Sequence, residues 1–313
     1  MRTWVTGATG QIGSRLCIEL ARVGHEVTAI SSRPAQSTSL YQWVQWDMSR
    51  DSFDVRNALT PDVVFHLAAQ TSAYQARQDL PADVTTNLLG FVRLLDALRQ
   101  TNSSPHVFLT GAATEVGATS SGIIRDSDPD DPQTFYDVSK VAQNLYLKQC
   151  TSEGWVEGTT IRLPNVYGGV GGDALTERGF LNQSIRRALL GEDLRYYSDG
   201  EYIRDFLHVD DVVNALMSAM NHRMAVVGQT FLIGTGTGTR IREALAEVAR
   251  QAEQITGTSV HLVDAIPPVG MYDIERRNVV VDSFRFRDRT RWEPSVSLEE
   301  GIRRTIRGTM ELS

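Results

Sequence analysis

Near its N-terminus the chain reads Thr6-Gly7-Ala8-Thr9-Gly10-Gln11-Ile12-Gly13, directly after a short apolar strand predicted for residues 3–6. Ile12, Leu16 and Leu20 then recur on one stripe, which predicts an amphipathic helix. Gly7 permits a tight turn, Gly10 lets the backbone approach phosphates, and Gly13 lets helix and strand pack closely. Strand, glycine turn and helix in this order favour a dinucleotide pyrophosphate site over a purely structural turn.

The alternation of strand and helix continues along the first half of the chain. Strands are predicted at residues 26–30, before Trp46, at 62–67, at 106–110 and within 155–163, with a long helix at 83–99. This predicts an α/β fold, a Rossmann-like doubly wound parallel sheet with ligands at the carboxyl ends of its strands. The helix at 83–99 is apolar over much of its circumference, so we hypothesise that it also forms a homodimer interface.

The second half predicts a smaller C-terminal α/β domain that binds the substrate. Helices are expected at 177–190, with Arg186 and Arg187 facing outward, at 209–221 and at 240–255, and short strands at 194–197, 260–263 and 278–281. The run 234–239 is interpreted as a loop rather than a phosphate cradle, because no lysine accompanies it. We therefore expect an NADP-binding domain of residues 1–168 plus about 209–235, and a second domain of about 169–208 plus 236–313.

Composition excludes several classes of protein. The chain has 313 residues, 41% apolar and 22% charged, which is typical of a globular protein, and its net charge of −7 argues against binding nucleic acid or an anionic membrane. Cys17 and Cys150 match neither a disulfide framework nor a zinc site, so we expect buried thiols, no metal and a cytoplasmic protein. No apolar run reaches membrane-spanning length, and the first strand follows no secretory leader.

The end of the second strand bears on the choice of coenzyme. An acidic residue there would bind the ribose of NAD, but the chain has Ser31-Ser32-Arg33. Two hydroxyls and a guanidinium suit the 2′-phosphate of NADPH, so NADPH (NADP) is favoured over NAD, the alternative being an exposed loop arginine. Asp47 could accept from the adenine amino group or cap a following helix. The predicted coenzyme-binding residues are Thr6, Gly7, Gly10, Gln11, Ile12, Gly13, Ser32, Arg33, Asp47, Met48, Leu67, Ala68, Ala69 and Thr110.

Tyr136 and Lys140 are the candidate catalytic residues. They stand four residues apart in a predicted helix, so the phenol and the ammonium can face one pocket. A free phenol has a pKa of about 10, so it is a poor proton donor or acceptor at neutral pH. A fixed cation beside it should lower that pKa and allow proton exchange with a carbonyl or an alcohol. The alternative is an ordinary surface pair.

An ordered set of motifs carries a family resemblance. The chain contains TGATGQIG at 6–13, HLAA at 66–69, YDVSK at 136–140, RLPNVYG at 162–168 and RDFLHVDD at 204–211, and ends with WEP at 292–294 and SLEEG at 297–301. The set resembles the extended short-chain dehydrogenase/reductases, the NAD-dependent epimerase/dehydratase family, over nearly the whole chain. The second half most resembles dTDP-4-keto-6-deoxyhexose 4-ketoreductases of antibiotic sugar biosynthesis.

The resemblance implies roles for individual residues. Tyr136 would be the acid/base, Lys140 would hold the nicotinamide ribose, and Pro164 would line the nicotinamide. The residues implied for the nucleotide diphosphate of the sugar substrate are Asn165, Arg204 and Arg277, with Arg276 as the alternative to Arg277. Tyr197 could pack against the nucleobase or serve as hydrophobic cover.

The sequence also departs from the family pattern. The family has a Ser or Thr after the fifth strand, hydrogen-bonded to the substrate oxygen, whereas this chain has Ala112 or Ala113 there, depending on the alignment. Thr114 could substitute, although a shift of one residue redirects a side chain. Val116 replaces the usual tyrosine before the glycine.

These features predict reduction of the C4 ketone of a dTDP-4-keto-6-deoxysugar by NADPH, with Tyr136 protonating the oxygen. The alternative is a nucleotide-sugar 4-epimerase with tightly bound NAD. A 4,6-dehydratase needs an acidic pair where this chain has Thr114-Glu115, and a non-catalytic coenzyme-binding protein is supported only by the missing hydroxyl.

Overall fold

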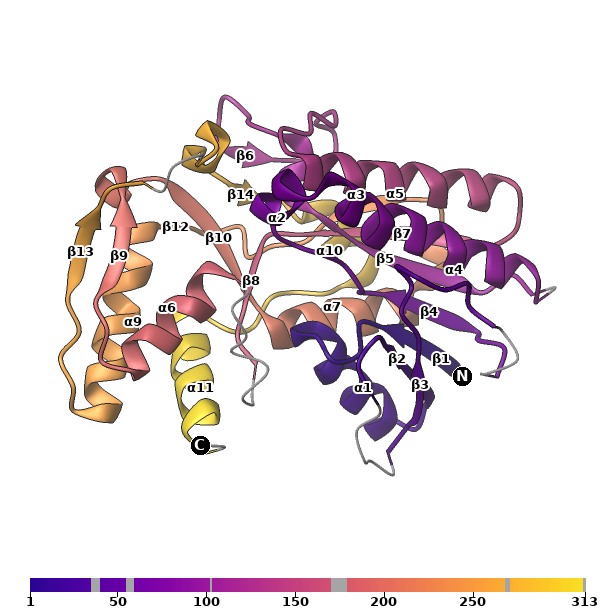
Figure 1. The fold of residues 1–313 in the computed structure, drawn as a ribbon, viewed down its shortest axis with the longest axis horizontal. Coiled ribbons are helices and arrows are strands. Elements are labelled where there is room, and N and C mark those ends of the chain that lie inside the picture. The colour runs from indigo at the N-terminus through magenta and orange to yellow at the C-terminus, as the bar shows by residue number, and fades with distance from the viewer. Residues whose placement is uncertain (35–39, 55–58, 102, 170–178, 268–270, 312–313) are drawn as a thin grey trace.

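The computed structural model describes residues 1–34, 40–54, 59–101, 103–169, 179–267 and 271–311. Its centre is a seven-stranded sheet in which every pair of neighbours is parallel, in the order β11-β7-β5-β4-β1-β2-β3 (Figure 1). The strands are β1 (Arg2–Thr6), β2 (Glu26–Ser31), β3 (Gln42–Gln45), β4 (Val63–His66), β5 (His106–Ala112), β7 (Glu157–Leu163) and β11 (Thr230–Leu232). The predicted Rossmann-like sheet is confirmed, and β11 is a strand that the sequence analysis did not predict.

Helices cover both faces of this sheet because alternate side chains of each strand point to opposite faces (Figure 1). Val5 and Phe65 pack with α1 (Gln11–Arg22) and α7 (Val209–Asn221). Trp4 and Val64 pack with α4 (Gly90–Arg99) and α5 (Phe135–Ser152). Burial on both faces favours nearly continuous apolar runs in the central strands, and β4 reads Val63-Val64-Phe65-His66 with all four side chains buried.

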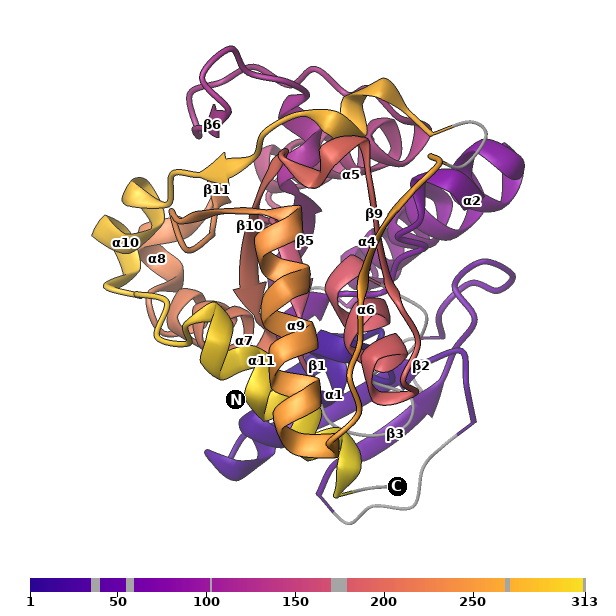
Figure 2. The ribbon, with the colours of Figure 1, turned by 90° about the vertical axis from the view of Figure 1, so that its left-hand side faces the viewer.

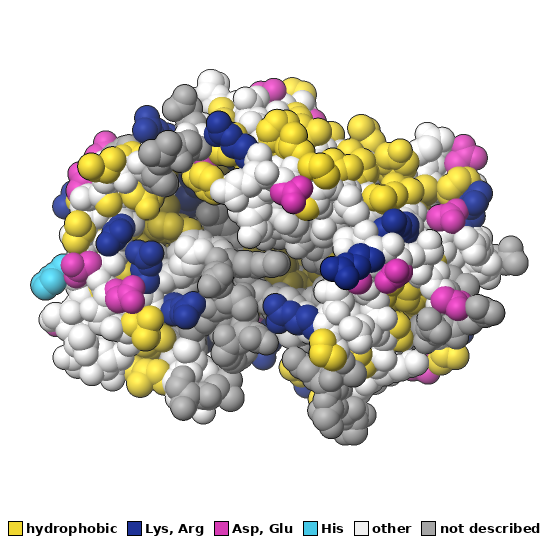
Figure 3. All heavy atoms as spheres, viewed as in Figure 1, with side chains coloured by type: hydrophobic (Ala, Val, Ile, Leu, Met, Phe, Trp, Pro, Cys, Tyr) yellow, Lys and Arg dark blue, Asp and Glu magenta, His cyan; other side chains and the backbone are white. Residues whose placement is uncertain are grey.

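The helix predicted for residues 83–99 is built differently. It begins with α3 (Leu80–Asp83), widens into the π-helical turn η2 (Val84–Leu89), and continues as α4. A Cβ on Gly90 would lie 2.9 Å from the Met48 side chain, so only glycine lets the helix approach this closely. Exposed apolar side chains gather over these helices and α5 (Figure 3); they include Leu80, Val84, Leu89, Phe135, Val138, Leu145 and Tyr146. The homodimer stays a prediction.

A smaller set of elements builds a second core beside the sheet (Figure 2). β9 (Leu194–Tyr197) pairs in parallel with β13 (Leu262–Ala265). Three helices, α6 (Phe180–Leu189), α9 (Ile241–Thr256) and α11 (Leu298–Met310), pack their apolar faces together, with α9 and α11 side by side. Of the helix expected at 177–190, residues 177 and 178 lie outside the described part of the chain.

Short strands connect the two cores. β10 (Ile203–His208) lies between β8 (Asn165–Tyr167), to which it is parallel, and β12 (Gly238–Arg240), to which it is antiparallel. A further parallel pair joins β6 (Ile123–Ile124) to β14 (Val280–Val281). The remaining helical segments are α2 (Ala73–Gln78), η3 (Ala113–Val116), η4 (Ser198–Gly200), α8 (Arg223–Val226), η5 (Asp273–Arg276) and α10 (Phe284–Thr290).

A buried carboxylate organises residues 234–237, which form a loop as predicted, whereas Gly238 and Thr239, predicted as part of the same loop, belong to strand β12. Asp205 on β10 is fully buried and accepts hydrogen bonds from the amides of Thr235, Gly236 and Val281 and from the Thr235 hydroxyl, at 2.7–3.2 Å. Burial raises the pKa of Asp205, and these four donors oppose that rise. The Asp205 carboxylate therefore serves as the hydrogen-bond acceptor for the amides of Thr235 and Gly236.

Asp205→Asn should lower the free energy of unfolding by about 2–4 kcal/mol, because an amide NH₂ would face buried donors that lose their acceptor. Urea unfolding followed by circular dichroism measures this difference. Asp264→Asn, on exposed β13, is the matched control and should change stability by less than about 0.5 kcal/mol. Equal stability of the two variants would contradict this role for Asp205.

Candidate active site

Two adjoining cavities lie where the parallel strands end. The first, the glycine-loop cavity, measures about 720 Å³ and is lined by the turn that includes Gly7, Gly10 and Gly13. The second, the arginine cavity, measures about 970 Å³ and is lined by Arg186, Arg204 and Arg277, among others. Both include Arg33, Thr71, Thr114, Tyr136, Asn165, Gly179 and Val279 in their walls, so ligands in the two cavities would meet at these residues.

The glycine-loop cavity has the form that a pyrophosphate requires. Gly7 has a φ of +69°, and a Cβ on Gly13 would lie 2.3 Å from the carbonyl oxygen of Gly7. Helix α1 starts after Gly10 with no side-chain cap, so among the described residues no side chain caps the first amides of the helix. Unpaired amides and the positive end of the helix dipole favour an anion there.

The structure brings all of the predicted coenzyme-binding residues to this cavity. Its walls contain Thr6, Gly7, Gly10, Gln11, Ile12, Gly13, Ser32, Arg33, Asp47, Met48, Leu67, Ala68, Ala69, Thr110, Tyr136, Lys140 and Pro164. Their contacts with a coenzyme stay predictions. Thr6 fixes the loop after β4, because its hydroxyl accepts from the amides of Leu67 and Ala68 at 3.2 and 3.3 Å.

The C-terminal end of β2 carries the hydroxyls of Ser31 and Ser32 and the guanidinium of Arg33, and it has no acidic side chain. The Ser31 hydroxyl lies 3.0 Å from that of Thr9 and accepts from the amide of Arg33 at 3.1 Å. Asp47 accepts from the amide and hydroxyl of Ser49 at 3.0 and 2.6 Å and pairs with Arg50 at 3.3 Å. Asp47 therefore caps a turn, and no helix follows it among described residues 47–54.

Tyr136 and Lys140 lie in the first turns of α5, which starts at the N-cap Thr134. The Lys140 ammonium is buried and donates to Oε1 of Gln143 at 2.7 Å. Burial lowers the pKa of Lys140 to about 8, while the carboxylates of Glu115 and Asp83 oppose that shift. The side chain is thus poised to change charge near neutral pH.

The expected lowering of the phenol pKa is not found. Burial raises the pKa of Tyr136, and the carboxylates of Glu115, Asp137 and Asp83 raise it further. The prediction rested on the cation four residues away, whereas the fold adds the carboxylates of Glu115 and Asp83 to that of the adjacent Asp137. Tyr136 is therefore protonated at neutral pH, the form that can donate to a carbonyl oxygen.

Ala112 ends β5, and Ala113 begins the short helical turn η3. The amide of Ala112 donates to Oε1 of Glu115 at 2.6 Å, and Ala113 is buried. Glu115 is itself fully buried and pairs at 2.7 Å with Arg162, which pairs at 2.7 Å with Asp130. Glu115 therefore links the end of β5 to β7, and it lines neither cavity.

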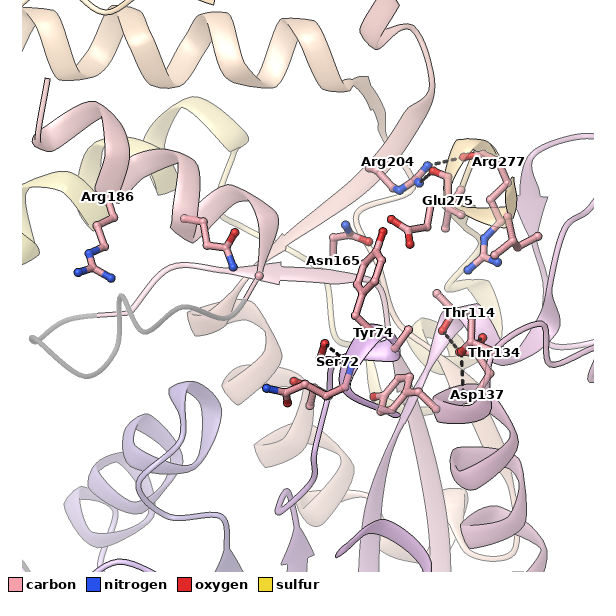
Figure 4. Close-up of a pocket in the computed structure, with 18 of the residues that line it drawn as sticks. Ser72, Tyr74, Thr114, Thr134, Asp137, Asn165, Arg186, Arg204, Glu275 and Arg277 are labelled. Atoms are coloured by element: carbon pink, nitrogen blue, oxygen red, sulfur yellow. Dashed lines mark hydrogen bonds between the residues drawn. The ribbon is translucent and has the colours of Figure 1, made fainter. Parts of the chain in front are cut away.

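The predicted substrate residues divide into two groups. Asn165, Arg204 and Arg277 line the arginine cavity (Figure 4), whereas Tyr197 lines neither cavity and Arg276 is exposed outside both. In β9 the neighbour Tyr196 faces the second core, so strand alternation turns Tyr197 the other way. Tyr197 lies close enough to Tyr74 of the cavity wall to interact with it electrostatically, and its contact with a nucleobase stays a prediction.

Arg204 is used differently from the phosphate contact that was expected. Its guanidinium donates to the carbonyl oxygens of Ile203, Glu275 and Arg277, and burial lowers its pKa to about 10. It thereby fixes the segment that carries Arg277 (Figure 4). Nη1 of Arg277 is buried and has no hydrogen-bond partner among the described residues, so Arg277 is the better candidate for an anionic ligand.

Sequence reasoning missed several residues in the walls of the arginine cavity, namely Tyr74, Asp137, Arg186 and Glu275. Arg186 was expected to face outward, and it is exposed, but the position of α6 makes that outer face one side of the cavity (Figure 4). Asp137 had a signal in the sequence, because it directly follows Tyr136. Tyr74 and Glu275 had none, because they reach the cavity from segments 200 residues apart.

Comparison with known proteins identifies the family. The model of the NAD dependent epimerase/dehydratase family matches residues 3–234. The chain belongs to this family. It is 31% identical to a UDP-glucose 4-epimerase of Mycolicibacterium smegmatis, across 98% of this chain and 97% of that protein. It is 28% identical to a GDP-6-deoxy-D-mannose reductase of Pseudomonas aeruginosa, across 96% and 95% of the two chains.

Solved structures agree. A UDP-glucose 4-epimerase from Thermus thermophilus in complex with NAD matches with a TM-score of 0.86 and 28% identity, over 98% of both chains. MoeE5 in complex with UDP-glucuronic acid and NAD matches with a TM-score of 0.85 and 27% identity, over 99% of both. The family expectation is confirmed, while the narrower likeness to dTDP-sugar ketoreductases is not shown by these relatives.

Two features are absent from the described residues. No helix among them has the length and apolarity needed to span a bilayer. They also contain no group of three or more His, Cys, Asp and Glu side chains arranged to hold a metal ion.

Lys140→Met should raise the free energy of unfolding at pH 7, by up to about 3 kcal/mol, because it removes a buried ammonium whose pKa is lowered from 10.5 to about 8. The gain should shrink as pH rises from 8 towards 10.5. In that window the unfolded wild-type chain holds the proton and the folded chain does not, so wild-type stability rises with pH.

Urea unfolding of both proteins at pH 7 and pH 9 checks this prediction. Lys148→Met, on the exposed side of the same helix, is the control and should show neither the gain nor the pH dependence. A Lys140→Met protein less stable than wild type at pH 7 would refute the argument.

Proposed function

We propose that this protein catalyses oxidation and reduction at C4 of a nucleotide-diphosphate sugar, with 4-epimerisation of a UDP-hexose as the leading reaction. The observation that carries the proposal is the position of Tyr136. It lies in the wall shared by the glycine-loop and arginine cavities, and buried Lys140, one helical turn further along α5, lines the glycine-loop cavity. A group there can exchange a proton with a sugar in one cavity while a coenzyme occupies the other.

The glycine-loop cavity fits a nicotinamide dinucleotide, which would supply a hydride acceptor and donor when bound. The uncapped start of α1 and the close contact of Gly7 with Gly13 suit its pyrophosphate. Lys140 would hold the nicotinamide ribose, and Pro164 would line the nicotinamide. NAD is the coenzyme of the similar epimerase and MoeE5 structures.

The chain's own residues divide the remaining work. Tyr136 gives its proton to the C4 oxygen in one direction and takes it back in the other. Lys140, charged below about pH 8, stabilises the oxygen as negative charge develops. Arg277 and Asn165 would hold the diphosphate, fixing C4 beside Tyr136 at little entropic cost during reaction.

The pairing of Glu115 weighs against a 4,6-dehydratase. Water elimination needs an additional acid and base that reach the sugar. Glu115 is fully buried, paired with Arg162 and bonded to the Ala112 amide, and it lines neither cavity.

A second candidate is net reduction of a 4-keto sugar by NADPH. Ser32 and Arg33 at the end of β2 favour it, because this strand end offers donors for a 2′-phosphate and no carboxylate for a ribose. The similarity to a GDP-6-deoxy-D-mannose reductase agrees with this alternative. A dTDP-4-keto-6-deoxysugar remains the substrate proposed for it.

The purified protein should convert UDP-glucose to UDP-galactose without added coenzyme, and the dinucleotide released on denaturation should be NAD. Chromatography of the products and of the released dinucleotide measures both. Tyr136→Phe should lower the rate by at least about a hundredfold while the dinucleotide stays bound, because a proton donor is removed and shape is kept. An unchanged rate in that variant would refute the mechanism. Release of NADP, with oxidation of NADPH by a 4-keto sugar, would instead select the reductase.

Arg33→Ala should weaken NADPH binding by about tenfold or more and leave NADH binding nearly unchanged, because only NADPH carries a phosphate for the guanidinium. Fluorescence titration of the two reduced coenzymes measures the ratio. Arg22→Ala, an exposed arginine of α1 paired with Glu19, is the control and should not alter it. Equal weakening of both coenzymes by Arg33→Ala would remove the case for NADPH.

A further inference from the structure

A carboxylate stands beside the catalytic tyrosine in the arginine cavity. Asp137, the third residue of α5, is 2% exposed, and the little surface that it has belongs to the cavity wall (Figure 4). Ala112 and Ala113 leave this part of the site without the hydroxyl found at that position in the family. The polar groups that the chain does offer there are those of Thr114 and Asp137.

The direction of the hydrogen bonds decides what Thr114 can do. Its hydroxyl donates to Oδ1 of Asp137 at 2.5 Å, and the Thr134 hydroxyl donates to Oδ2 at 2.8 Å. Because an ionised carboxylate only accepts, the proton of Thr114 is committed to Asp137. Thr114 therefore presents lone pairs to the cavity, and a substrate group that contacts it must be a donor.

The surrounding charges favour the same kind of ligand. Burial raises the pKa of Asp137, while the hydrogen bonds from Thr114 and Thr134 and the charge of Arg277 oppose that rise and favour the ionised carboxylate. Arg277 also has the unpartnered Nη1 suited to an anionic ligand. When a diphosphate binds Arg277, the positive charge of Arg277 is partly neutralised. The negative charge of Asp137 then acts more strongly on the sugar. Glu275 adds a second carboxylate to the cavity, and its Oε1 is buried with no hydrogen-bond partner in the described chain.

We propose that Asp137 and Thr114 form a sugar-selecting pair. It receives a hydroxyl of a neutral hexose through Thr114 and disfavours a sugar carboxylate through the charge of Asp137. The pair thus selects UDP-hexoses over UDP-hexuronates. This inference rests on the proposed function, since it assumes that the arginine cavity binds the sugar nucleotide.

A purely structural role for Asp137 makes a different prediction. Thr134 caps α5 by accepting from the Asp137 amide at 3.2 Å, and an acidic third residue also stabilises a helix start. A cap affects the stability of the helix and the binding of every ligand alike. It does not change the ratio of affinities for two sugars that share one nucleotide, so this ratio is the quantity to measure.

The experiment measures dissociation constants of UDP, UDP-glucose and UDP-glucuronic acid by calorimetry, for the wild-type protein and for Asp137→Asn, Thr114→Val and Thr114→Ser. Wild type should prefer UDP-glucose over UDP-glucuronic acid by about tenfold or more. Asp137→Asn should bring this ratio close to one. Thr114→Val should weaken UDP-glucose by about tenfold, and Thr114→Ser should restore it. UDP itself should bind both Thr114 variants as it binds wild type, and any change in UDP binding by Asp137→Asn, which faces Arg277, cancels in the ratio of the two sugar nucleotides.

Asp96→Asn is the matched control, because it removes the same charge from the exposed face of α4 and should leave the ratio unchanged. An unchanged ratio in Asp137→Asn, with UDP binding intact, would overturn the inference and leave the proposed function standing. If Asp137→Asn fails to fold, undiminished UDP-glucose binding by Thr114→Val overturns it instead. A wild-type protein that binds none of the three nucleotides refutes the proposed function itself.

Discussion

Burial of the Lys140 ammonium is the constraint on which the site depends. An ammonium removed from water is costly, and the fall of its pKa to about 8 records that cost. Two carboxylates oppose the fall, and each is held by a different part of the fold. Asp83 accepts from Ser139, Asn87 and Gln70, which join α5, η2 and the loop after β4. Displacement of either carboxylate would remove part of the compensation for the buried charge.

Glu115 extends this network to the sheet. Its bond from the Ala112 amide and its pair with Arg162 tie the end of β5 to β7, directly behind the position where the family carries a hydroxyl. The strand end is therefore rigid although its side chain is only a methyl. The same three carboxylates that support Lys140 or adjoin Tyr136 also raise the phenol pKa. Negative charge around Tyr136 favours the protonated phenol, and it favours an uncharged sugar over a sugar carboxylate as the ligand.

The sequence predicted correctly those features that depend on backbone conformation alone. A glycine at positive φ and another too close to a carbonyl for any side chain can be inferred from spacing, and Gly7 and Gly13 have these geometries. Chain order did not reveal which partners a side chain takes. Arg204 was expected to meet phosphate, and in the fold its guanidinium donates to three carbonyl oxygens. Tyr197, which could pack against a nucleobase or serve as hydrophobic cover, lines neither cavity. The π-helical turn η2 could not be predicted either, because π and α helices are built from the same kinds of residues.

The sequence by itself determined the parallel sheet, the glycine turn and the Tyr136–Lys140 spacing, because each follows from contacts within a few residues or from a simple period. Only tertiary structure decided the charge around the phenol and the direction of the Thr114 hydroxyl. Those properties arise from Asp83, Glu115 and Asp137, which different elements bring together. Electrostatic interactions act through space, so their outcome depends on distances between side chains that chain order does not contain.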